Sequence, residues 1–242
     1  MQQTQQNAQG SAPDAEHDRF GGGTLLLAGV VGSTAYGLAG PDSDIDRLGM
    51  FAAPTISLLG LSRPAESQVT TKPDATYHEA GKAARLILAG NPTAGELLWL
   101  PEDCYETRTP LGDEAIALRS SFLSAKRTRD AYLGYATQQF KKLIGRDEPN
   151  RRTEKHARHL MRLVNQGYEL YTTGRLRITI DDPEPYFAFG ERVAKDPQAA
   201  APFMAEAEQR FASARTVLPN EPDYAAVEAW LLRVRKAFWS EP

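Results

Sequence analysis

The stretch GSTAYGLAGPDSDID, residues 32–46, joins a Gly-Ser turn to a segment that ends in three alternating aspartates. The turn follows TLLLAGVV, residues 24–31, an apolar run bounded by glycines that is typical of a buried strand. Where such a strand turns at Gly32 and Ser33, backbone N–H groups and a hydroxyl point out of the sheet and can hold phosphate oxygens. The stretch therefore predicts an anion-binding turn beside a cluster of negative charge.

The alternation of the aspartates indicates what could share this site. In an extended chain, residues two apart point to the same face, so Asp44 and Asp46 would present their carboxylates side by side. Two such charges repel unless a cation neutralises them, and Mg²⁺ prefers carboxylate oxygens together with substrate phosphates. The turn and the aspartates would then hold opposite ends of one metal triphosphate. The alternative interpretation is a solvated turn leading into a strand, because Pro, Asp and Ser favour turns.

Three other motif classes do not fit the stretch. Counted from Asp42, an EF-hand loop needs Gly at its sixth position and Glu at its twelfth, where the sequence has Arg47 and Ala53. A serine-hydrolase elbow needs a glycine two residues to either side of Ser33, and both are missing. A Walker A loop needs a lysine after its second glycine, which is also missing. The metal-triphosphate site and the solvated turn are the two interpretations that remain.

Composition limits the class of protein. The chain has 242 residues, of which 41% are hydrophobic and 24% charged, so we expect a soluble globular protein with a substantial core. The net charge of −3 argues against a protein that is basic overall. Cys104 is the only cysteine, which excludes internal disulfides and favours a reducing, cytoplasmic compartment. The apolar runs are too short to cross a bilayer, so no membrane association is expected.

The order of polar, strand-like and helix-like segments along the sequence predicts an α+β fold in three parts. Residues 1–20 are polar and predict a disordered tail, whereas residues 21–110 alternate strand and helix patterns and form the expected core. Within this core, Asn91 and Pro92 are typical of a helix N-cap and first helical position. Residues 111–242 are almost wholly helical in pattern. The segments with helical spacing are 113–143, 154–173, 198–217 and 222–239.

The motifs together resemble a known family. GSTAYG followed by DSDID resembles the signature of the polymerase-beta-like nucleotidyltransferase superfamily. The later segments LILAGNPTAGELLWL, SFLSAK, KHARHLMRL and TGRL are similar to those of the RNA-repair-associated nucleotidyltransferases called RlaP. The resemblance runs from about residue 29 to residue 177. It implies a small nucleotidyltransferase core, with a mixed β-sheet flanked by helices, followed by an α-helical C-terminal half.

The resemblance also implies a reaction and its site. A nucleoside triphosphate such as ATP would donate its nucleoside monophosphate to an acceptor hydroxyl on RNA or tRNA, with release of pyrophosphate. Gly32 and Ser33 would bind the triphosphate, and Asp44 and Asp46 would be catalytic ligands of two Mg²⁺ ions. A small-molecule acceptor, or a catalytically inactive binding module such as a toxin–antitoxin component, are the alternative functions.

Members of the superfamily use a third acid from a neighbouring strand. The segment DATYHEAGKA offers Glu79, the first choice as a further catalytic metal ligand, and Asp74. The alternative for either residue is an ordinary acid at the turn between a strand and a helix. The sequence alone leaves the two candidates open.

A basic stretch forms the second candidate region. Lys155, His159 and Arg162 are four and three residues apart, so they share one face of a helix. Lys155 and Arg162 would bind the nucleotide or an RNA backbone if this face forms a wall of the cleft, but a solvated helix surface is the alternative. The basic residues of the stretch are Lys141, Lys142, Arg146, Arg151, Arg152, Lys155, Arg158 and Arg162.

Overall fold

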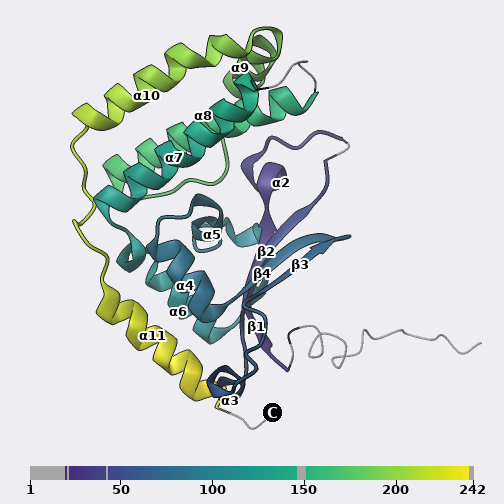
Figure 1. The fold of residues 1–242 in the computed structure, drawn as a ribbon, viewed down its shortest axis with the longest axis vertical. Coiled ribbons are helices and arrows are strands. Elements are labelled where there is room, and N and C mark those ends of the chain that lie inside the picture. Colours follow the sequence, from purple (N-terminus) through teal and green to yellow (C-terminus); the bar gives the residue numbers. More distant parts are fainter. Residues whose placement is uncertain (1–19, 21, 42, 146–150, 240–242) are drawn as a thin grey trace, which may run out of the picture.

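The computed structural model describes residues 20, 22–41, 43–145 and 151–239, and its N-terminal part is a five-stranded mixed sheet. Its strands lie in the order β3-β4-β2-β1-β5 (Figure 1). Only β2 and β4 are parallel; the other neighbours run antiparallel. The strands are β1 (Thr24–Val31), β2 (Asp46–Ala52), β3 (Ser67–Thr71), β4 (Asp74–Glu79) and β5 (Tyr105–Arg108). The predicted mixed sheet is confirmed.

The directions of the strands bring three chain segments together at one end of the strands. β1 ends at Val31, opposite Asp46, where β2 begins. β4 runs parallel to β2 with Ala75 opposite Arg47, so β4 begins at the same edge as β2. The Gly-Ser turn and the starts of two strands therefore lie together.

Helices cover the sheet and continue into a helical second half, as predicted. α4 has its N-cap in Glu79, and α5 begins at Pro92 with the Asn91 side chain accepting a hydrogen bond from the Ala94 N–H at 3.0 Å. The helices are α2 (Gly32–Tyr36), α3 (Thr55–Leu59), α4 (Ala80–Leu88), α5 (Pro92–Glu96), α6 (Pro110–Ala117), α7 (Ala125–Ile144), α8 (Arg151–Thr173), α9 (Glu184–Lys195), α10 (Ala201–Ser213) and α11 (Tyr224–Ala237), with short 3-10 turns at Glu102–Cys104, Arg119–Phe122 and Pro197–Ala200.

The helical half forms a layer of long helices above the sheet, and then the chain returns. α7 and α8 pack side by side, with α9 and α10 against them, whereas α11 runs back along α4 and α6 toward the sheet (Figure 1). The Trp230 indole of α11 is fully buried and donates to the Leu111 carbonyl at 2.9 Å. The last helix therefore stabilises the N-terminal core.

The core has a part on each face of the sheet. The larger part joins the sheet to the helices, and the smaller one lies on the opposite face around Phe51 and Tyr77. Phe20 is buried there and stacks on Phe51 with 4.9 Å between ring centroids. The rest of the predicted disordered tail, residues 1–19, lies outside the described residues. Within the described part of the chain, no helix combines the length and the apolar character that a bilayer crossing requires.

Candidate active site

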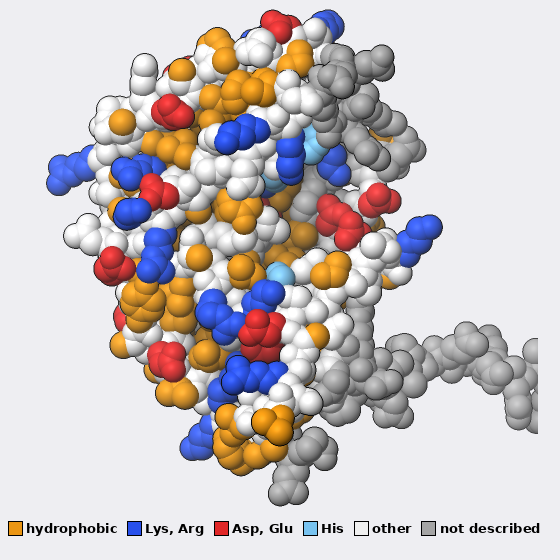
Figure 2. Space-filling model, in the orientation of Figure 1, with side chains coloured by type: hydrophobic (Ala, Val, Ile, Leu, Met, Phe, Trp, Pro, Cys, Tyr) orange, Lys and Arg blue, Asp and Glu red, His pale blue; other side chains and the backbone are white. Residues whose placement is uncertain are grey.

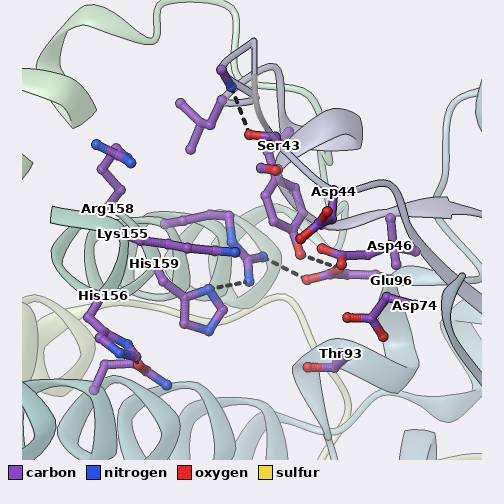
Figure 3. Close-up of a pocket in the computed structure, with 18 of the residues that line it drawn as sticks. Ser43, Asp44, Asp46, Asp74, Thr93, Glu96, Lys155, His156, Arg158 and His159 are labelled. Carbon is purple, nitrogen blue, oxygen red and sulfur yellow. Dashed lines mark hydrogen bonds and ion pairs between the residues drawn. The ribbon is translucent and has the colours of Figure 1, made fainter. Parts of the chain in front are cut away.

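A cleft of about 980 Å³ lies between the sheet edge and α8. In the close-up, the carboxylates Asp44, Asp46, Asp74 and Glu96 stand on one side, and basic and histidine side chains from α8 stand on the other (Figure 3). On the molecular surface, acidic side chains likewise lie near basic and histidine ones beside a hollow (Figure 2). The charged and histidine side chains among the lining residues are Asp44, Asp46, Arg47, Asp74, Glu96, Lys142, Glu154, Lys155, His156, Arg158, His159 and Arg162.

The Gly-Ser turn lies directly on this cleft, as Gly32 and Ser33 both line it. Gly32 has a φ of +70°, a conformation that costs other L-residues about 1–2 kcal/mol. A Cβ at this position would lie 2.2 Å from the Asp46 Oδ2 atom. Glycine is therefore required twice, once for the backbone and once for the close approach of the carboxylate. The preceding Val31 has an apolar side chain, so the N-cap residue of α2 caps none of the N–H groups of the first turn.

Three carboxylates come together beside this turn. Asp44, Asp46 and Asp74 line the same cleft, the last two because β2 and β4 begin in parallel at one edge. Burial raises the pKa of Asp46; Lys155 opposes this rise, and Asp74 and Asp44 add to it. Asp46 therefore lies close enough to Asp74 and Asp44 to be affected by their negative charge, and a divalent cation would relieve this repulsion.

The donor set fits Mg²⁺ when a substrate completes the coordination. Among the described residues, no group of three His, Cys, Asp or Glu side chains is arranged as a metal site by itself. Mg²⁺ is usually held by one or two carboxylates, waters and substrate phosphates rather than by a cage of protein ligands alone. Asp44, Asp46 and Asp74 supply carboxylates of this kind next to a turn that can hold phosphate.

Glu79, the preferred third acid, is not brought to the cleft. It ends β4 opposite Phe51, at the far end from Asp74, and is only 3% exposed. Both of its oxygens accept from Arg235 of α11, at 2.5 and 2.9 Å, and one also accepts from the Gly81 N–H at 2.8 Å. The carboxylate thus caps α4 and anchors α11. Of the two candidates on this strand, the structure places Asp74 beside Asp44 and Asp46.

The basic wall comes mainly from α8. Lys155 and Arg158 line the cleft, together with Lys142 of α7. Figure 3 shows Lys155 extending toward the carboxylates. Lys141 is exposed and is not among the described lining residues. The remaining predicted positions, Arg146 and the side chains of Arg151 and Arg152, lie outside what the structure describes.

Arg162 lies at the cleft, but protein groups occupy much of its guanidinium. Its side chain is 1% exposed, and Nη1 donates to Glu96 and to Gln166, both at 2.6 Å. The guanidinium carbon lies 3.9 Å from the centre of the Tyr36 ring, and the Tyr36 hydroxyl donates to Glu96 at 2.6 Å. The predicted phosphate ligand is therefore chiefly a buried link between α2, α5 and α8.

Arg162 also determines the state of His159, a residue for which the sequence predicted only a place on the helix face. The Arg162 Nη2 atom lies 3.1 Å from Nδ1 of His159, and a guanidinium can only donate. Nδ1 must therefore be the acceptor, and the ring proton resides on Nε2. Burial, followed by the charge of Arg162, lowers the pKa of His159 to about 3, so the ring stays neutral near pH 7. His159 thus brings an uncharged N–H donor to a cleft that many charged side chains line.

Sequence comparison gives the site its context. A family model, the RNA repair pathway DNA polymerase beta family RlaP, matches residues 3–179. No curated protein matches the chain. The matched range includes the Gly-Ser turn, all three cleft aspartates and α8, and it ends before α9. The chain therefore belongs to the RNA repair pathway DNA polymerase beta family.

Proposed function

We propose that the protein is a divalent-metal-dependent nucleotidyltransferase that transfers a nucleoside monophosphate from a nucleoside triphosphate to a hydroxyl group of RNA. The observation that carries the proposal is one cleft in which three carboxylates and a glycine turn face a basic helix. The family, a polymerase beta-type family of an RNA repair pathway, supports both the transfer and the RNA acceptor.

The reaction forms one bond and breaks another. At phosphorus, the acceptor oxygen bonds to the α-phosphorus, the bond from that phosphorus to the bridging oxygen breaks, and pyrophosphate leaves. The acceptor hydroxyl gives up its proton to solvent. Two Mg²⁺ ions held by Asp44, Asp46 and Asp74 would supply Lewis-acid stabilisation of the charge on the phosphoryl group and the acceptor oxygen. Gly32 and Ser33 would bind triphosphate oxygens through backbone N–H groups and the hydroxyl.

The basic wall would act on the same phosphates from the other side. Lys155 is close enough to Asp46 to act on its pKa, so its ammonium also reaches the region that a metal triphosphate would occupy. The Nε2–H of His159 can donate to a phosphate oxygen without adding charge. Lys142 and Arg158, which also line the cleft, are suited to the backbone of an RNA acceptor.

A labelling experiment tests the proposal and its alternatives. The protein is incubated with Mg²⁺ and each nucleoside triphosphate, labelled at the α-phosphate or the γ-phosphate, with and without total RNA. We expect α-label in RNA, γ-label in pyrophosphate, and neither product with Asp46→Asn. Label in a small product without RNA would support the small-molecule acceptor instead. Binding of nucleotide without any transfer would support the inactive binding module.

A further inference from the structure

The cleft has a lining residue from a part of the chain that the family match does not include. Phe187 of α9 lines the cleft, although the matched residues end at 179. α9 is packed tightly on α8, since a Cβ at Gly190 would lie 3.2 Å from Cγ of Arg158. The Asn165 side chain of α8 also donates to the Tyr186 hydroxyl at 3.1 Å. Phe187 is thus held in place by the contact between two helices.

Arg158 of α8 lies against this ring. Its guanidinium carbon is 5.2 Å from the centre of the Phe187 ring, within the range of a cation–π contact. The Arg158 side chain is 19% exposed and also pairs with Glu154 at 3.4 Å, so it is held on the cleft side of α8. A planar cation and an aromatic ring therefore stand together at the cleft.

The position of this pair excludes it from the metal site. Figure 3 shows Arg158 across the cleft from Asp44, Asp46 and Asp74, with Lys155 between them. A triphosphate held at the carboxylates would meet Lys155 first. The part of a substrate that reaches Arg158 and Phe187 is then a part other than the reacting phosphates.

The chemistry of the pair points to a flat, aromatic group. Nucleobases stack on aromatic side chains and on arginine guanidinium planes, and every base can do so because every base has a π-face. We infer that Arg158 and Phe187 form a stacking subsite for a nucleobase, either that of the triphosphate donor or that of the terminal nucleotide of the RNA acceptor. The inference rests on the proposed function and adds a base-recognition element from the C-terminal segment.

The same helix contains a natural comparison. Arg192 of α9 lies 5.3 Å from the ring centre of Phe189, but Phe189 is buried against Phe203, with 5.0 Å between the ring centres. Neither Arg192 nor Phe189 is among the described lining residues of the cleft. Arg192→Lys is therefore a matched control for Arg158→Lys, because both variants keep the charge and lose the guanidinium plane.

Equilibrium binding in Mg²⁺ tests the subsite. The ligands are ATP, inorganic tripolyphosphate, a short single-stranded RNA and a ribose-phosphate strand of equal length without bases. The proteins are wild type, Phe187→Ala, Phe187→Leu, Arg158→Lys and Arg192→Lys, each checked by thermal melting. Because one base stack contributes about 1–3 kcal/mol, we expect Phe187→Ala to weaken binding of the base-containing ligand roughly five- to 150-fold. Arg158→Lys and Phe187→Leu should weaken it less, and Arg192→Lys should leave it unchanged.

The outcomes separate the two sources of the base. Loss of ATP affinity with unchanged tripolyphosphate affinity would assign the donor base. Loss of RNA affinity with unchanged affinity for ATP and for the strand without bases would assign the acceptor base. The inference would be overturned if, for each of the four ligands, Phe187→Ala and Arg158→Lys bound as tightly as wild type. It would also be overturned if the variants lost the same affinity for ligands with bases and for ligands without them. Wild-type transfer is measured in parallel, so that its absence counts against the proposed function and not against the subsite.

Discussion

Strand β4 begins and ends with an acid, and the two carboxylates have opposite surroundings. Glu79, at one end, is paired through both oxygens with Arg235 and caps α4. Asp74, at the other end, lies beside Asp44 and Asp46 on one side of the open cleft. The charge at the first end is satisfied within the protein, whereas the charges at the second repel one another and favour an external cation. Pairing inside the fold, and not residue type or strand, separates a structural acid from a candidate catalytic one.

The largest effect should come from substitutions at the Asp74 end of β4, where the carboxylates line the cleft. Asp46→Asn and Asp74→Asn should each lower nucleotidyl transfer by about three orders of magnitude or more, because a catalytic metal contributes several kcal/mol to transition-state stabilisation. The metal-free variants should melt at or above the wild-type temperature, since repulsion is removed. Transfer assays and thermal melts check both halves. A variant that melts well below wild type and still transfers nucleotide would contradict the assignment.

A substitution at the Glu79 end of β4 should lower stability and leave transfer intact. Glu79→Ala removes the partner of the largely buried Arg235 and the cap of α4, so the free energy of unfolding should fall by about 3 kcal/mol. Transfer per folded molecule should remain. Denaturant titration and activity at a temperature where the variant is folded measure the two quantities, with Asp74→Ala as the control on the same strand. Loss of transfer in a folded Glu79→Ala protein would restore Glu79 as the third acid.

Gly32→Ala should affect both fold and site. The positive φ costs about 1–2 kcal/mol, and the new methyl group must displace the Asp46 carboxylate that lies 2.2 Å from its position. Gly37→Ala is the matched control, since Gly37 has a φ of +74° but its nearest neighbour would be 3.7 Å from the added carbon. We expect similar melting of the two variants and at least a tenfold weaker Mg²⁺–nucleotide affinity in Gly32→Ala alone. Equal affinities would mean that the turn shapes the backbone without shaping the site.

His159 provides a smaller test of the basic wall. Loss of one hydrogen bond to a charged group costs about 1.5–3 kcal/mol, so His159→Ala should reduce transfer roughly ten- to 150-fold. His159→Gln, which keeps an N–H donor, should recover part of the loss. Because the pKa of His159 is about 3, its ring NMR signals should show no titration between pH 5 and 8. A titration near pH 6.5 would contradict the hydrogen bond from Arg162.

The smallest effect concerns the pH dependence of the metal-free fold. Burial, with a further contribution from Asp74 and Asp44, raises the pKa of Asp46 above its ordinary value of 3.8. As pH rises past that value, the unfolded chain releases this proton first, so ionisation of Asp46 lowers the free energy of unfolding. Asp46→Asn does not ionise, and its melting temperature relative to wild type should therefore increase by up to a few degrees from pH 3 to pH 7. A difference in melting temperature between Asp46→Asn and wild type that does not change with pH would contradict the raised pKa of Asp46.

Local sequence predicted the parts of the molecule that local patterns govern. The apolar run of residues 24–31 predicted β1, and Asn91 with Pro92 predicted the start of α5. The sheet-edge strands β3 and β5 are short and half exposed, so they lack such a pattern. α9 was not predicted, because Pro183 and Pro185 interrupt the pattern where that helix begins.

The candidate site was predictable where one motif contains it. Gly32, Ser33, Asp44 and Asp46 lie within 15 residues and line one cleft. The choice between Asp74 and Glu79 depends on the direction of β4 and on Arg235, which lies 156 residues after Glu79. Phe187 belongs to a helix that follows all the recognisable motifs. Pairings between distant segments therefore set the limit of what the sequence could predict.

The ion pair between Arg235 and Glu79 has a consequence for folding during biosynthesis. A ribosome adds about 5–20 residues per second and completes the N-terminal part first. The 156 residues that separate Glu79 from Arg235 thus take on the order of ten seconds to synthesise, during which the sheet exists without its last helix. Nascent-chain folding of this protein should accordingly be late, with protease resistance of the N-terminal core gained only after α11 has left the exit tunnel.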